Sequence, residues 1–384
     1  MAVEPQDPPA AEEGEEERQE DLRVSRLLSD RRQLVSLALV FVLAIVAIYF
    51  LLPKFVGLDD NLERIGEATW YWVVIAVGFN VLAFASYVAL FRGILGGPGE
   101  DEVRRRLDVR ASYQITMAGL AATRIFSAAG AGGIVVTYWA LRKAGMPRRR
   151  SACRMVAFLV LTYSVYLTAL VVFGILLRTG VLPGAAPVGG TIVPAAVAGA
   201  VMLLLGLVAL LPGNFERRIH SVTGDGRVAR LAEKLATGPA TLATGVRTAL
   251  DYVKHPRRGA LAIAGAIGFW AAQIGILWAS FEAFGGHVAF GVLVQGFFVG
   301  MTANLIPSPA GGVGSVDAGM IGAFLLFGVD GATVFPAVLT YRIIAFWLPI
   351  PPGVVAYFQL VRTVHGWERE RGYTSQSKVT AEAT

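Results

Sequence analysis

Three ionisable residues lie within or beside long apolar segments, where charged side chains are rare: Arg124, Asp317 and Arg342. A guanidinium can hold a phosphate through two parallel hydrogen bonds, and a carboxylate at membrane depth can take up a proton or a cation. Each residue also has a structural alternative. Arg342 can pair with Asp317 or with hairpin carbonyls, Arg124 can extend to the cytoplasmic face, and Asp317 can cap a helix. The two arginines are the first candidates for binding an anionic group, and Asp317 is the candidate for binding a proton or a cation.

Two glycine-rich stretches resemble each other; the first contains Arg124 and the second ends three residues before Asp317. Residues 119–133 and 300–314 align without a gap and share seven identical positions. A broken apolar segment at matching places in two halves of a membrane protein indicates a transporter's binding site, although small residues also match by chance in membrane helices. The stretches add candidate lining residues, which in the case of serine and asparagine can equally join helices, and candidate hairpin-shaping residues. The lining residues are Ser127, Asn304, Ser308, Gly311, Gly312 and Gly314, and the shaping residues are Gly130, Gly133, Pro307 and Pro309.

The composition is that of a membrane protein. The chain has 384 residues, of which 55% are hydrophobic and only 16% charged, whereas soluble domains carry about 25% charged residues. Cys153 is the only cysteine, the four histidines are scattered, and no phosphate loop or hydrolase motif occurs. Ser308 as a nucleophile would need a base, and no histidine lies in an apolar run near it. We therefore expect no metal, no cofactor and no enzymatic activity.

Eight apolar runs predict an all-α membrane bundle. They lie at residues 34–52, 69–91, 111–140, 155–177, 192–212, 259–284, 288–327 and 332–360. Arginine and lysine concentrate in the loops 92–110, 142–154 and 213–258 and after residue 360, which the positive-inside rule places in the cytoplasm. Because these basic residues flank apolar runs, they indicate the inner leaflet rather than nucleic acid as their partner.

Two of the eight runs fit this topology only as re-entrant hairpins. The run 111–140 has basic loops at both ends, so it should enter from the cytoplasm, turn at 127–133 and return. The run 288–327 should do the same from outside, with its turn at 307–314. This gives six full spans plus two opposed hairpins, and an inverted repeat of 69–177 and 259–360. Such turns need a polar cavity, and the helix N-termini that follow them favour an anion.

Three segments complete the expected organisation. Residues 1–33 form an acidic and basic cytoplasmic tail, residues 34–360 form the transmembrane domain, and residues 361–384 form a second cytoplasmic tail. Within the domain, the loop 213–258 has apolar residues at helical spacing. It predicts an amphipathic helix, broken at Gly238-Pro239, that lies on the inner leaflet or packs under the bundle.

The second half resembles a known family. The sequence from Asn304 through Asp317, followed by Tyr341-Arg342 and then Trp347-Leu348-Pro349, is similar to the signature of lysylphosphatidylglycerol synthase transmembrane regions, also called flippase-like domain proteins. Ala310 replaces a frequent glycine and Asp317 a frequent glutamate. The first half lacks the proline and the Gly-Glu pair that the family usually shows.

The resemblance implies a multi-pass protein of the bacterial inner membrane, with both termini cytoplasmic, that moves a lipid between leaflets. Tyr341 is also a candidate site residue, because it precedes Arg342 in the part of the sequence that resembles the family signature. The partners would be phospholipids or polyprenyl-phosphate lipids. The alternative is a non-transporting accessory subunit of a glycosyltransferase or lipid-modifying enzyme. Lipid aminoacylation is not expected, because the longest polar loop, about 45 residues, is too short for the family's soluble synthase domain.

Overall fold

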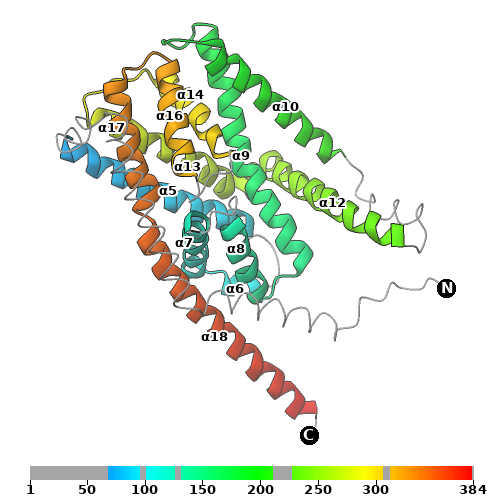
Figure 1. The fold of residues 1–384 in the computed structure, drawn as a ribbon. Helices are drawn as coiled ribbons and strands as arrows, with labels where there is room; N and C mark the ends of the chain where they lie inside the picture. The colour runs from blue at the N-terminus through cyan, green and yellow to red at the C-terminus, as the bar shows by residue number, and fades with distance from the viewer. Residues whose placement is uncertain (1–67, 96–100, 126–130, 211–226, 306–311, 383–384) are drawn as a thin grey trace. The chain divides into compact units, whose positions relative to one another are not determined.

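The computed structural model describes residues 68–95, 101–125, 131–210, 227–305 and 312–382 (Figure 1). All regular structure in these ranges is helical, and they contain no strand, which confirms the expected all-α class. The predicted first span at 34–52 and the N-terminal tail lie outside the described residues.

Five of the described helical segments are long and apolar enough to cross a membrane, which takes roughly 20 residues. The corresponding helices are α5 (Trp70–Leu95), α9 (Arg148–Arg178), α10 (Ile192–Ala209), α13 (Pro256–Glu282) and the continuous run of α17 (Gly331–Arg342), the π-helical η4 (Ile343–Trp347) and α18 (Ile350–Glu382). A short 3₁₀ turn, η2 (Val188–Gly190), leads into α10. Each coincides with an apolar run of the sequence, so the chain is a multi-pass membrane protein.

The two remaining apolar runs each fold into a pair of shorter helices. The first pair is α7 (Val109–Ile125) with α8 (Ala131–Lys143), preceded by α6 (Asp101–Arg106). The second is α14 (Phe290–Met301), extended by η3 (Thr302–Leu305), with α16 (Ser315–Leu326). An α-helix rises about 1.5 Å per residue, so the 12-residue helix α16 of the second pair measures about 18 Å. That length is well short of a hydrocarbon core of roughly 30 Å.

Glycines set the close approach of the arms in both pairs. A Cβ built on Gly133 would lie 2.7 Å from the carbonyl oxygen of Gly119, and one built on Gly319 would lie 2.8 Å from that of Gly300. Gly119 and Gly300 are the residues that match when the two glycine-rich stretches are aligned. Each pair is therefore antiparallel and held together by backbone contact that only small residues permit.

Helices α5 and α13 form an antiparallel scaffold between the pairs. A Cβ on Gly265 would lie 2.7 Å from the carbonyl oxygen of Ser86, and one on Gly93 would lie 2.6 Å from the amide nitrogen of Ala262. At the far end, the amide of Thr69 donates to the carbonyl of Ala283 over 3.0 Å. The two helices thus stay in close contact along their length.

We expect Gly265→Ala to lower the free energy of unfolding by about 1–3 kcal/mol, because the added methyl group would collide with the backbone of α5. Gly78→Ala in α5 is the matched control, since nothing lies within 4 Å of its Cβ position. Thermal unfolding in detergent measures both changes. Equal midpoints for the two variants would contradict this account of the helix pair.

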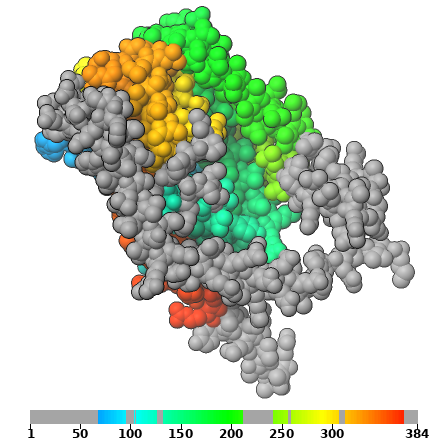
Figure 2. Space-filling view, in the orientation of Figure 1, coloured from blue at the N-terminus to red at the C-terminus, as the bar shows by residue number. Residues whose placement is uncertain are grey.

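The buried apolar side chains form two clusters. One joins α14, α16 and α17 to the second half of α13 and the second half of α9. The other joins α6, α7, α8 and α18 to the first part of α13 and the end of α5. Figure 2 shows side chains of α14 and α16 (yellow to orange) beside those of α9 and α10 (green). Each helix pair therefore has its own core, and the α17–η4–α18 run passes from one core to the other.

Each helix pair packs against a long helix from the other half of the sequence. The arm α7 of the first pair packs against α18, which ends the second half. The arm α14 of the second pair packs against α9, which ends the first half, and the hydroxyl of Tyr166 on α9 donates to the carbonyl of Phe298 over 2.7 Å. Each helix pair therefore packs against the long helix that follows the other pair in the sequence.

Helix α12 (Arg227–Lys254) occupies the long loop between the halves and corrects one prediction. It continues through Gly238-Pro239, where a break was expected, because a proline removes only one hydrogen bond of an otherwise continuous helix. Its described buried face consists of Ala243, Val246 and Ala249, whereas Leu250 is 41% exposed. The helix thus packs against α9, α10 and α13 through small residues and leaves larger apolar side chains uncovered.

Candidate functional site

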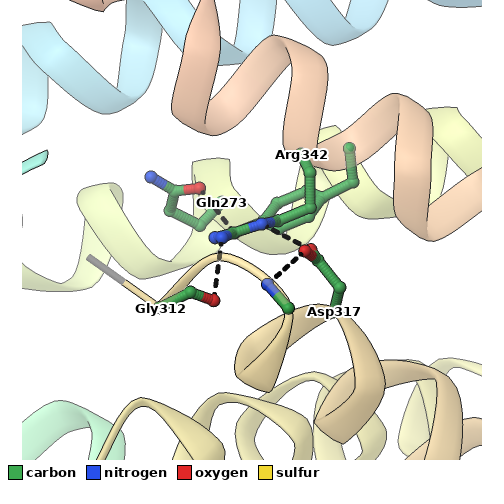
Figure 3. A network of polar contacts seen from close by, with 6 residues as sticks. Gln273, Gly312, Asp317 and Arg342 are labelled. Carbon is green, nitrogen blue, oxygen red and sulfur yellow. Dashed lines mark hydrogen bonds and ion pairs between the residues drawn. The ribbon is translucent and has the colours of Figure 1, made fainter. Parts of the chain in front are cut away.

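Arg342 lies in the last turn of α17, and only 5% of its side chain is exposed. Its Nε is 2.6 Å from Oδ1 of Asp317, and its Nη2 donates to the carbonyl oxygen of Gly312 over 3.1 Å (Figure 3). These are the two structural partners that the sequence suggested as alternatives. The guanidinium therefore ties α17 to the beginning of α16.

Asp317 holds the second helix pair at the same point. It lies in the first turn of α16, where its Oδ2 accepts the amide N–H of Gly314 over 2.9 Å, as expected of a capping residue. Gly314 and Gly312 have φ angles of 84° and 91°, which L-residues with a side chain rarely adopt. A Cβ on Gly312 would also lie 2.7 Å from Oδ1 of Asn304. The glycines thus let the chain bend beside the ion pair.

Arg124, near the end of α7, reaches the same region from the other half of the sequence. Its Nη1 donates to the carbonyl oxygen of Phe346 and its Nη2 to that of Ala345, each over 2.9 Å. The side chain therefore does not extend to the cytoplasmic face, which was the alternative raised by the sequence. It instead occupies two carbonyls of the π-helical segment η4.

The ring of Phe346 contacts both guanidinium groups. The Cζ atom of Arg342 lies 4.4 Å from the ring centroid, and that of Arg124 lies 5.2 Å away. A cation within about 6 Å of a ring face is attracted by the negative face of the π-system. Phe346 is 7% exposed, so the ring and both arginines form one cluster. We call Arg124, Asp317, Arg342 and Phe346 the arginine cluster.

The arginine cluster carries excess positive charge. It contains two guanidinium groups and one carboxylate, and within the described ranges no acidic side chain forms an ion pair with Arg124. Buried charges are normally paired, so an unpaired positive charge favours the binding of an anion. No group of three or more metal-ligating side chains occurs among the residues that the structure describes.

Comparison with known proteins shows which family contains this chain. The model of the lysylphosphatidylglycerol synthase transmembrane region matches residues 33–353. The chain belongs to this family. It is also similar to a UPF0104 membrane protein of Methanothermobacter thermautotrophicus, with 26% identity over 144 residues. That match covers 36% of this chain and 42% of the relative, so it spans less than half of the relative's length.

The family match includes every residue of the arginine cluster. The family region is a membrane region, and the described chain correspondingly consists of helices without a separate soluble domain. The resemblance noted in the sequence is thus confirmed over most of the chain, including the first half, where the motif is less typical.

The structure assigns the predicted site residues to three groups. Those brought together beside the ion pair are Arg124, Asn304, Gly312, Gly314, Asp317 and Arg342. Gly133 lies at the interface between α7 and α8, where it contacts Gly119 and the side chain of Thr123. The remainder fall outside the described residues: Ser127, Gly130, Pro307, Ser308, Pro309 and Gly311.

Tyr341 and Phe346 show what the sequence did and did not indicate. The hydroxyl of Tyr341 donates to Oε1 of Gln273 on α13 over 3.1 Å, so this predicted residue links two helices. Phe346 was not predicted. Its position four residues after Arg342 places both on the same helix face, and this spacing was the available signal.

Proposed function

We propose that this protein moves a phospholipid, or a lipid-linked anionic headgroup, between the two leaflets by alternating access. The observation that carries the proposal is the positive arginine cluster, in which side chains of both helix pairs and of the α17–η4–α18 run meet. A headgroup phosphate is the anion that a membrane supplies in quantity. The acyl chains would remain in lipid while the headgroup contacts Arg124 and Arg342.

The proposal includes the topology expected from the sequence. The helix pairs α7–α8 and α14–α16 are proposed as re-entrant hairpins that enter from opposite sides, and residues 69–177 and 259–360 as an inverted repeat. Three observations support this: the short arms of the second pair, the antiparallel contact of α5 with α13, and the reciprocal docking of the hairpins. Repeats of this kind place a transporter's site where their halves meet.

Asp317 has a proposed role in the same cycle. When a phosphate engages Arg342, the carboxylate loses its counter-ion inside the membrane. A carboxylate at membrane depth can take up a proton or a cation, so Asp317 is the candidate for coupling translocation to a pH gradient. The protein would then act in the bacterial inner membrane, across which such a gradient exists.

The experiment is a translocation assay in proteoliposomes. It follows headgroup-labelled phosphatidylglycerol, a labelled polyprenyl-phosphate sugar and labelled phosphatidylcholine, with wild type and Arg342→Ala, with and without an imposed pH gradient. We expect protein-dependent movement of an anionic lipid that Arg342→Ala abolishes, while phosphatidylcholine moves much more slowly. If folded wild type moves neither anionic lipid under any condition, the accessory-subunit function becomes the better explanation.

A further inference from the structure

The α17–η4–α18 run is interrupted by a cluster of prolines at the point that Arg124 contacts. Pro349, Pro351 and Pro352 have no amide N–H to donate. In an α-helix the carbonyl of Ala345 would accept from residue 349, and in a π-helix the carbonyl of Phe346 would accept from residue 351. In either register, one of these two carbonyls loses its donor to a proline.

Arg124 supplies donors to these two carbonyls. Its guanidinium bonds both Ala345 and Phe346, residues that are more than 200 positions away in the sequence. Beside this contact the backbone is wound as a π-helix, in which the amide of Leu348 donates to the carbonyl of Ile343 over 2.9 Å. The side chain of one helix pair thus completes the hydrogen bonding of a weakened helix in the other half.

The interruption separates two packed bodies. Before it, α17 packs against α13 and α16 and belongs to the core of the second helix pair. After it, α18 packs against α7 and α8, and a Cβ on Gly353 would lie 2.8 Å from the carbonyl oxygen of Met117. A rotation at residues 343–352 would therefore move one helix pair relative to the other.

The two arginines differ in what an anion must displace. Arg342 is paired with Asp317. A phosphate that binds Arg342 leaves the carboxylate, whose Oδ1 atom is buried, without its partner, and this costs free energy. Arg124 contacts only neutral carbonyls through the bonds described, whereas a phosphate offers the guanidinium an opposite charge and two acceptor oxygens that match its planar donors. Arg124 is thus the more available of the two for an incoming phosphate.

We infer that residues 343–352 form a hinge and that Arg124 is its ligand-sensitive latch. A phosphate-bearing lipid headgroup that binds Arg124 withdraws the guanidinium from Ala345 and Phe346 and thereby frees the hinge. This inference rests on the proposed function, because it assigns to that site the residue that senses the substrate.

Hydrogen exchange measured by mass spectrometry tests the latch in the full-length protein. The protein is placed in nanodiscs of phosphatidylcholine alone or with phosphatidylglycerol, and the amides of Leu348 and Gly353 report on the hinge. In wild type, phosphatidylglycerol is expected to raise their exchange about tenfold, the effect of losing a hydrogen bond to a charged group. In Arg124→Gln the exchange should be equally high in both lipids.

A second substitution separates the latch from a general effect of removing a charge. Pro349→Ala restores the amide that an α-helix offers to Ala345, so in the Arg124→Gln background it should bring hinge exchange back toward the wild-type value. Arg124→Lys should give an intermediate value and serves in place of Arg124→Gln if that variant does not fold. Arg110→Gln, an exposed position in the same helix, is the matched control and should behave as wild type.

The outcomes are distinct from those of the translocation assay. Equal exchange in wild type and Arg124→Gln, or no response of wild type to phosphatidylglycerol, would overturn the latch even if lipid moves. A response to phosphatidylglycerol without translocation would support the latch and contradict the proposed function. Inorganic phosphate added to phosphatidylcholine nanodiscs should have no effect, and an equal response to it would overturn the assignment of a lipid headgroup as the ligand.

Discussion

Arg342→Gln is expected to lower the free energy of unfolding by about 3 kcal/mol and to abolish lipid translocation. The variant leaves the partly buried Asp317, whose side chain is 19% exposed, without its counter-ion and the carbonyl of Gly312 without its donor. Removing one partner of a buried pair is more costly than removing both, because the remaining charge has no compensation. Asp317→Asn should cost less, since Asn can still accept the amide of Gly314 and Arg342 keeps its contact with Phe346.

The double variant Arg342→Gln with Asp317→Asn separates stability from function. Two neutral amides can bond each other, so we expect the double variant to recover most of the stability lost in Arg342→Gln. In a double-mutant cycle, the two substitutions should therefore show a clear coupling energy. Translocation should not recover, because the anion still lacks its guanidinium. A double variant that moves lipid at the wild-type rate would show that the pair serves only to hold the helices together.

The Lys143–Glu368 ion pair provides the control for this cycle. Its side chains are 23% and 41% exposed, in contrast to the buried pair. Partly exposed pairs contribute about 0–1 kcal/mol, so neutralising both residues should change neither the midpoint of thermal unfolding nor the transport rate by much. A large coupling there would mean that the assay reports general charge effects.

The partners of Arg342 could be predicted from the sequence, and the reason is physical. A buried arginine at membrane depth has few possible partners, and Asp317 with the broken backbone around Gly312 offered the nearest ones. The helix ranges could be predicted for a related reason, since bilayer thickness fixes the length of an apolar run. The family signature then located these residues within one motif.

The contact of Arg124 with η4 could not be predicted in the same way. The proline run that includes Pro349 shows that carbonyls near Ala345 lack donors, but the donor comes from a distant helix. Its identity depends on how α7 packs against α18, which local patterns do not encode. Phe346 was missed because an aromatic residue in a membrane helix is most often a packing residue.

Helix α12 shows a different limit of pattern reading. Its regularly spaced leucines and valines predicted an amphipathic helix on the inner leaflet or under the bundle. Of this stripe, Val246 is buried together with Ala243 and Ala249, whereas Leu242 and Leu250 are exposed. The reason is the close approach to α9: a Cβ on Gly245 would collide with Val156. Where helices meet this closely, small residues contribute much of the interface, and apolar periodicity alone does not reveal that contribution.

Phe346→Leu is expected to produce the second large effect, because one ring serves two cations. Leucine keeps much of the apolar volume but removes the negative ring face that lies near both guanidinium groups. At about 1 kcal/mol for each of the two cations, together with a packing cost, the loss of stability should be about 2–3 kcal/mol. Thermal unfolding measures this loss in Phe346→Leu, in Phe346→Tyr and in the control Phe358→Leu at an exposed position. Only Phe346→Leu should lower the midpoint of unfolding substantially.

The transport rate of the same variants shows whether the ring does more than pack. The ring stabilises two positive charges without contributing a negative one, so it keeps the cluster able to accept an anion. An additional carboxylate would hold the arginines as well but would neutralise the site. We therefore expect Phe346→Tyr to retain translocation of anionic lipid and Phe346→Leu to reduce it about tenfold, the consequence of losing roughly 1.4 kcal/mol at the site. Equal transport by both variants would mean that the arginines keep their positions without the ring, and that the backbone carbonyls of Ala345 and Gly312 suffice to hold them.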